Sequence, residues 1–195
     1  MCSVDKLRRS LLIGVGALAL TFALPAQAND PGQRAIDVVE RLLTQAHGAM
    51  TSGQNGAALR GAIDSAFNFE IWERFLLQRH DAAFSGPQMQ EFRTLLPGFL
   101  AHLYREQFAL GLTRQPVVGE ARKVRKDTMV SSEFYRSNGQ TLPVDWRVRD
   151  QGEPLVIDMM VGGTSFLTLK RDEFQAILNS DGPDGLLDHM RSRAL

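Results

Sequence analysis

The feature that most constrains the fold is a pair of strands between residues 142 and 161. A period of two along residues 142–149 separates one apolar set of side chains from a polar set on the opposite face, and the apolar set is Leu142, Val144, Trp146 and Val148. Residues 151–154 have the composition of a turn. The next strand is predicted to carry Leu155, Ile157, Met159 and Val161 on one side. Two paired strands with one apolar face need an apolar cover.

The first 28 residues predict a cleaved signal peptide. Three basic residues, Lys6, Arg8 and Arg9, precede an apolar run over residues 11–24, and small residues follow where a signal peptidase would cut after Ala28. The apolar run is shorter than the roughly 20 residues that a membrane-spanning helix needs. The sequence therefore predicts export, with the periplasm as the expected location. Cys2 is the only cysteine and would leave with the signal peptide.

The charge of the predicted mature chain argues against nucleic acid as a partner. The whole sequence has 22 basic and 22 acidic residues, and removing residues 1–28 leaves 19 and 21. Nucleic-acid-binding proteins instead show a marked excess of positive charge. Residues 29–195 are long enough to bury a core, and we expect them to form a single domain.

The order of periodic segments predicts an α+β fold. Helical spacing is expected over residues 31–50, 55–66, 68–78 and 87–110, with a kink or break in the last helix at Pro97. Strands are expected over residues 117–126, 129–135, 142–149 and 155–161, with residues 164–169 as an extension of the last strand. Helices return over residues 171–178 and 186–193, separated by a break at Gly182-Pro183. The predicted architecture is N-terminal helices on a twisted, antiparallel, four-stranded sheet, followed by C-terminal helices.

One set of large apolar side chains is the candidate binding site. It takes residues from the long helix and from the strand pair: Phe99, Leu103, Tyr104, Phe108, Val144, Trp146, Val148, Ile157, Met159 and Phe166. These side chains can line a ligand pocket or fill a solid core. Periodicity alone does not separate the two cases.

The sequence offers little that indicates catalysis. The four histidines lack the spacing of a metal site, and phosphate-binding and serine-hydrolase motifs are absent. Asp158 lies within an apolar strand, where it can act as a base of raised pKa. It can equally lie on the polar face or bind a neighbouring arginine such as Arg171, which we favour. The basic run 122–126 can contact phosphate headgroups or an acidic partner, or protect a strand edge.

Several short motifs from Ile36 to the C-terminus resemble the MlaC family. This is a family of periplasmic phospholipid-binding proteins, also called toluene-tolerance auxiliary proteins. The motifs are Phe67-Asn68-Phe69-Glu70, then Phe92 with Leu95-Leu96 and Leu103-Tyr104, then Val144-Asp145-Trp146, Val156-Ile157-Asp158-Met159, Val161-Gly162-Gly163-Thr164-Ser165 and Lys170-Arg171-Asp172-Glu173-Phe174. The last two blocks are the most specific, and none of the motifs is a catalytic signature.

The resemblance implies a fold like NTF2 or cystatin and a carrier without enzyme activity or cofactor. Such a carrier binds a phospholipid between sheet and helices, with Tyr104, Val144, Trp146 and Met159 as the best candidates for tail contacts. Its expected partners are an outer-membrane lipoprotein complex and an inner-membrane ABC transporter with an MCE-domain ring. Residues 76–79 and Pro154-Leu155 depart from the usual family pattern, and the 162–165 block also resembles a hopanoid-associated branch. A small NTF2-like enzyme and a structural component of an envelope complex stay as alternatives.

Overall fold

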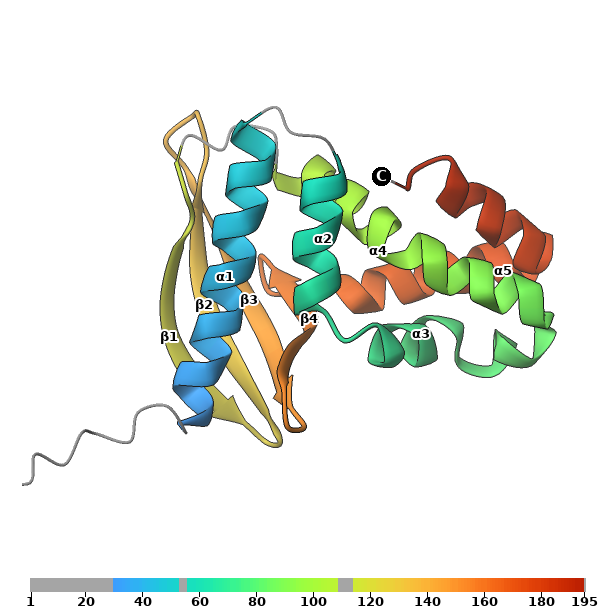
Figure 1. Cartoon of the computed structure of the whole chain (residues 1–195), viewed down its shortest axis with the longest axis horizontal. Coiled ribbons are helices and arrows are strands. Elements are labelled where there is room, and N and C mark those ends of the chain that lie inside the picture. Colours follow the sequence, from blue (N-terminus) through green and yellow to red (C-terminus); the bar gives the residue numbers. More distant parts are fainter. Residues whose placement is uncertain (1–29, 53–55, 109–113, 195) are drawn as a thin grey trace, which may run out of the picture.

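The computed structural model describes residues 30–52, 56–108 and 114–194, and the predicted signal peptide lies outside these ranges. The helices are α1 (Pro31–Thr51), α2 (Gly56–Ala66), α3 (Phe69–Leu77), the 3-10 helix η2 (Gln78–Ala83), α4 (Gly86–Phe108) and α5 (Phe166–Arg191). The strands are β1 (Val117–Val124), β2 (Asp127–Tyr135), β3 (Thr141–Asp150), β4 (Pro154–Val161) and β5 (Thr164–Ser165). The order of helices, then strands, then a helical C-terminus confirms the predicted α+β class (Figure 1).

The strands form one antiparallel sheet in the order β1-β2-β3-β4-β5. Each strand pairs with its neighbour in sequence, so short turns suffice for every connection. The predicted count of four strands was low by one, because Thr164 and Ser165 pair with the end of β4. The predicted extension over residues 164–169 was also wrong. The Ser165 side chain accepts a hydrogen bond from the Thr168 amide and caps a helix that begins at Phe166.

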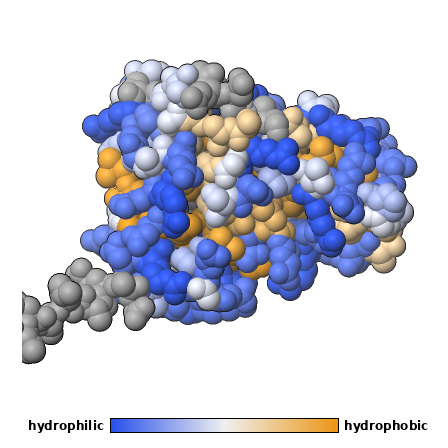
Figure 2. All heavy atoms as spheres, viewed as in Figure 1, coloured by the Kyte–Doolittle hydropathy of each residue, from blue (hydrophilic) through white to orange (hydrophobic). Residues whose placement is uncertain are grey.

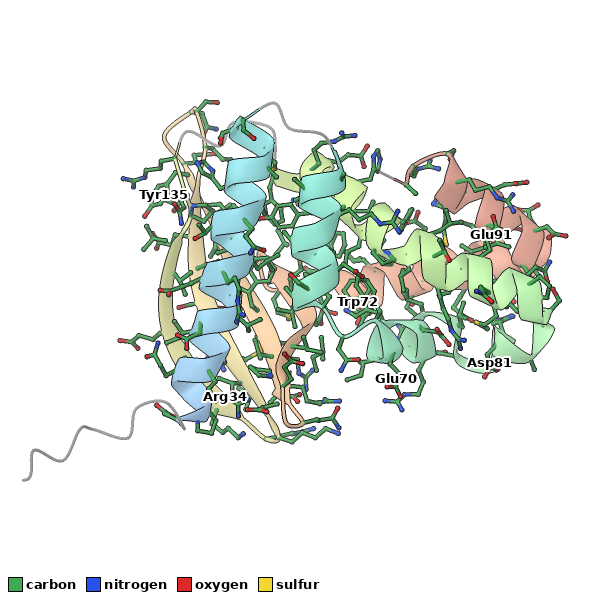
Figure 3. All side chains as sticks on the ribbon, in the orientation of Figure 1. Arg34, Glu70, Trp72, Asp81, Glu91 and Tyr135 are labelled. Atoms are coloured by element: carbon green, nitrogen blue, oxygen red, sulfur yellow. The ribbon has the colours of Figure 1, made fainter. Side chains whose placement is uncertain are left out.

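Helix α1 lies across the sheet and covers one face of it (Figure 1). Its start follows from local chemistry: the Asp30 carboxylate accepts from the Gly32 amide at 3.0 Å, and Pro31 occupies the first turn. Arg34 then ties this end of the helix to the β3–β4 turn (Figure 3). Its guanidinium lies 2.8 Å from the Asp150 carboxylate and donates to the Gly152 carbonyl at 2.8 Å.

Helices α3, α4 and α5 extend the molecule beyond the edge of the sheet, and α2 lies beside α1 (Figure 1). Trp72 lies where α2 meets α3 and is 1% exposed (Figure 3). Helix α4 is continuous through Pro97, so of the predicted kink or break, the break does not occur. The C-terminal break does occur: α5 consists of two segments that meet at Gly182, where φ is 67° and ψ is −166°. Only glycine adopts this conformation readily.

One apolar cluster joins the helices to the sheet. Its side chains come from α1, α2, α3, α4 and α5 and from one face of β2, β3 and β4, which we call the inner face. The opposite, outer face carries the charged residues of the strands. Figure 2 shows a largely hydrophilic surface in which hydrophobic residues emerge mainly in the middle of the molecule, between α1 and the helices beyond the sheet.

Candidate functional site

Nine of the ten candidate residues belong to the apolar cluster that joins the helices to the sheet. We call these nine the interior cluster, and each is at most 7% exposed. They are Phe99, Leu103, Tyr104 and Phe108 on α4, Val144, Trp146 and Val148 on β3, Met159 on β4, and Phe166 at the start of α5. The sequence therefore identified a set of residues that the fold brings together from four elements.

Aromatic rings connect the end of α4 to the sheet within this cluster. The ring centroids of Tyr104 and Phe108 are 4.7 Å apart, and Phe108 stacks on Phe134 of β2 at 4.4 Å. Phe134 in turn lies 6.5 Å from Trp146. Phe134 was not among the candidates predicted from the sequence, although Ser131 and Glu133 alternate with Ser132 and Phe134 along β2. The rings meet each other directly, so a ligand chain between α4 and the sheet requires that some of them move.

Of the two polar side-chain groups in the interior cluster, the Trp146 indole has a hydrogen-bond partner and the Tyr104 hydroxyl has none among the described residues. The Trp146 indole donates to the Ser132 hydroxyl at 2.8 Å, and that hydroxyl donates to the Val144 carbonyl at 2.9 Å. The Tyr104 hydroxyl, by contrast, is buried and has no hydrogen-bond partner among the described residues. Burial raises the pKa of Tyr104, so the group stays neutral. A buried hydroxyl without a partner costs about 1–3 kcal/mol, which a hydrogen-bond acceptor placed beside it would recover.

Ile157 is the candidate that lies elsewhere, because β4 contains a bulge. Val148 of β3 pairs with Val156 and Arg147 pairs with Asp158, so Ile157 is an extra residue between two register positions. The inner face of β4 is therefore formed by Val156, Met159 and Val161, and not by the regular alternation that we predicted. Ile157 is 4% exposed and lines a groove together with Asp158.

This groove has a volume of about 440 Å³ and lies between the outer face of β3 and β4, helix α3 and the start of α5. Its lining combines apolar side chains with arginines. The lining residues are Ile71, Arg74, Phe75, Gln78, Arg147, Arg149, Ile157, Asp158, Met160, Ser165, Leu167 and Thr168. No other member of the ten candidates lines it.

Two of the groove arginines are held by one buried carboxylate. Asp127, at the start of β2, is fully buried, and its oxygens accept from Nε of Arg147 and Nε of Arg149, each at 2.7 Å. Burial acts to raise the pKa of Asp127, but the hydrogen bonds from Arg149 and Arg147 outweigh it and hold the pKa below its usual range. The result is a rigid pair of guanidinium groups on the outer face.

Asp158 organises the junction between β4 and α5. Its oxygens accept from the Met159 amide at 2.8 Å, the Leu167 amide at 3.0 Å and the Ser165 hydroxyl at 2.6 Å. Burial raises the pKa of Asp158, while these hydrogen bonds act in the opposite direction. The position on the polar face agrees with the interpretation that we favoured. The suggested partner Arg171 was wrong, because its guanidinium binds Asp172 instead.

Two of the histidines lie beside glutamates. His102 lies 3.2 Å from Glu106 and His189 lies 3.0 Å from Glu173. Within residues 30–52, 56–108 and 114–194, no group of three or more histidine, cysteine or acidic side chains is placed to hold a metal ion. In the same ranges no helix combines the length and hydropathy that a membrane crossing needs.

A family model described as "MlaC protein" matches residues 33–192. The chain belongs to the MlaC family. The family resemblance predicted from the sequence motifs is thereby confirmed. A comparison with curated protein sequences finds no significant match.

In a comparison with solved structures, this MlaC chain is similar to a phospholipid-binding protein from Ralstonia solanacearum. The structure of that protein was determined in complex with a phospholipid. The TM-score is 0.67 at 19% sequence identity, and the match covers 84% of this chain and 96% of the other. At this identity the likeness establishes the fold, and it confirms the architecture that the family resemblance implied.

Proposed function

We propose that this protein is a periplasmic carrier that binds a phospholipid in its interior and moves it between membranes. Membership in the MlaC family over residues 33–192 is the observation that carries the proposal. The structural likeness to a phospholipid-binding protein solved with its lipid supports it. The predicted signal peptide over residues 1–28 supports the location.

The physical task of such a carrier needs no catalysis. The two acyl chains of a phospholipid expose apolar surface to water at a cost of about 25 cal/mol per Å². An apolar interior removes this cost, and the polar headgroup stays in water at the entrance. A partner that favours the open form of the protein then suffices to release the lipid.

We assign the acyl chains to the interior cluster, next to Tyr104, Val144, Trp146 and Met159. The backbone of α4 approaches α2 and α5 more closely than it approaches the strands, so large rings span the distance between α4 and the sheet. Rings in such a position can turn aside while both layers keep their backbone hydrogen bonds. The unpaired Tyr104 hydroxyl would then donate to an ester carbonyl of the lipid.

The further elements of the proposal concern partners and cargo. A lipid carrier of this family would exchange its cargo with an outer-membrane lipoprotein complex and with an inner-membrane ABC transporter that bears an MCE-domain ring. A hopanoid is the alternative cargo, because residues 162–165 resemble the hopanoid-associated branch. No observation favours the enzyme alternative: both oxygens of Asp158, its candidate base, already accept hydrogen bonds that connect β4 to α5.

A photo-crosslinking experiment tests the proposed location. Benzoylphenylalanine replaces Phe108 in the interior cluster in one variant and Phe75 beside the outer groove in a matched control. After export to the periplasm of a Gram-negative host and irradiation, mass spectrometry identifies the attached lipid. We expect a phospholipid adduct at position 108 and none at position 75. A phospholipid adduct at position 75 alone would move the phospholipid to the groove, and folded protein without any phospholipid adduct would contradict phospholipid binding.

A further inference from the structure

The outer groove is a separate site from the interior cluster and has an apolar floor. Five of its lining side chains are apolar: Ile71, Phe75, Ile157, Met160 and Leu167. They come from α3, β4 and α5, so the groove is formed only in the folded chain. Its volume of about 440 Å³ lies in the lower part of the range of ligand pockets. A single alkyl chain with a small headgroup suits this size better than a two-chain lipid.

The charges around this floor are suited to an anion. Arg74 is exposed, and its guanidinium makes no ion pair with another described residue. Arg147 uses only Nε toward Asp127, so its two terminal nitrogens are available to a ligand. Asp158 is the one carboxylate in the lining, and its oxygens already accept hydrogen bonds from two amides and the Ser165 hydroxyl. The site therefore offers donors to an acid and offers little to an incoming cation.

We propose that the groove binds a single-chain anionic amphiphile, such as an alkyl phosphate or a fatty acid. The acid group contacts the guanidinium groups of Arg74 and Arg147, and planar guanidinium suits both carboxylate and phosphate. The chain lies over Ile71 and Ile157. Arg147 is already fixed by Asp127, so binding orders little besides the Arg74 side chain.

Methyl NMR distinguishes this groove from the interior. In mature protein with labelled isoleucine and valine methyl groups, Ile71 and Ile157 report the groove and Val144 reports the interior. Octyl phosphate should shift the two isoleucine signals and leave Val144 unchanged. Hexyl phosphate should bind about 15-fold more weakly, because it has two methylene groups fewer and each buried methylene raises the affinity roughly fourfold. Octanoate should compete with octyl phosphate, since both carry an acid on one chain.

Matched variants separate the acid contact from general effects of charge. Arg74→Gln should weaken the binding of octyl phosphate at least tenfold. Arg79, on the neighbouring η2, does not line the groove, so Arg79→Gln should leave binding unchanged. If inorganic phosphate bound as tightly as octyl phosphate, the apolar floor would contribute nothing to binding, and the proposal would be overturned. If octanol bound as tightly as octyl phosphate, the arginines would contribute nothing, and the proposal would be overturned too. Shifts at Val144 alone would place the ligand in the interior, and the same groove shifts with an oligoglutamate peptide would assign the groove to an acidic protein segment.

Discussion

The inner face of the sheet carries Trp146 and Val148 and lies under helices, whereas the outer face carries Arg147 and Arg149 beside an open groove. These residues alternate along one strand, so the contrast arises from a period of two. The inner face is stabilised by apolar packing, which is not directional and so allows aromatic rings to rearrange. The outer face is held by directional bonds: those to Asp127 fix β2 against β3, and those to Asp158 fix β4 against the start of α5. Under the proposed function, the inner side of the sheet would deform to admit a lipid, and the outer side would preserve the fold when the inner side opens.

The largest expected effect tests the inner face. Trp146→Ala should lower the free energy of unfolding by about 3–5 kcal/mol, because it leaves a cavity in the core. Asp145→Ala, one residue earlier on the outer face and half-buried, should change it by no more than about 0.5 kcal/mol. Urea unfolding followed by circular dichroism measures both. Equal effects of the two substitutions would remove the distinction between the faces.

The next prediction tests the outer face through Asp127. Asp127→Asn should destabilise the protein at pH 7 by roughly 1.5–3 kcal/mol, because charged hydrogen bonds to Arg147 and Arg149 become neutral ones. The pKa of Asp127 is lowered in the folded state. Its contribution is therefore present above the unfolded value of about 3.9 and is lost as the pH falls through the lower, folded value. Unfolding curves of both proteins between pH 7 and pH 2 should converge toward the acid end, and a constant difference would contradict the account.

Asp158 should show the opposite dependence on pH. Its pKa is raised by burial, so the folded protein holds the proton more tightly than the unfolded chain does. The stability of the wild type relative to Asp158→Asn should be greatest below about pH 3.9 and should decrease as the pH rises through the higher, folded value. Unfolding free energies across this window measure the difference. If the unfolding free energy of the wild type instead increased relative to that of the variant as the pH rises, the burial of this carboxylate would be contradicted.

The smallest effect concerns Tyr104. Tyr104→Phe removes a buried hydroxyl that has no partner among the described residues, so the lipid-free protein should keep its stability or gain up to about 1 kcal/mol. The same variant should retain less phospholipid if the hydroxyl donates to the lipid. Differential scanning calorimetry of lipid-free protein and quantification of extracted lipid provide the two readouts. A loss of stability without lipid would indicate a hydrogen bond within the protein.

Much of the inner face could be predicted from the sequence because its pattern is local. The alternation along β3 places Val144, Trp146 and Val148 correctly, and the helical spacing of α4 places Tyr104 and Phe108. These assignments depend only on backbone period and side-chain polarity, which a short window of sequence contains.

The features that sequence reasoning missed depend on distant partners. Residues 155–161 are apolar except for Asp158, so nothing in the strand itself marks the bulge at Ile157, which arises from pairing with β3. Whether Phe166 continues a strand or begins a helix depends on Asp158, which accepts from the Leu167 amide. Arg74 joins the groove only because α3 lies beside β4.

Native mass spectrometry of the mature protein, purified from the periplasm without detergent, shows whether the chain carries a lipid. We expect the mass of the chain plus at least one phospholipid, and loss of this adduct when the inner face is disrupted by Trp146→Ala but not by the outer-face change Asp145→Ala. A folded chain that carries no lipid, even after incubation with phospholipid vesicles, would rule out a phospholipid carrier.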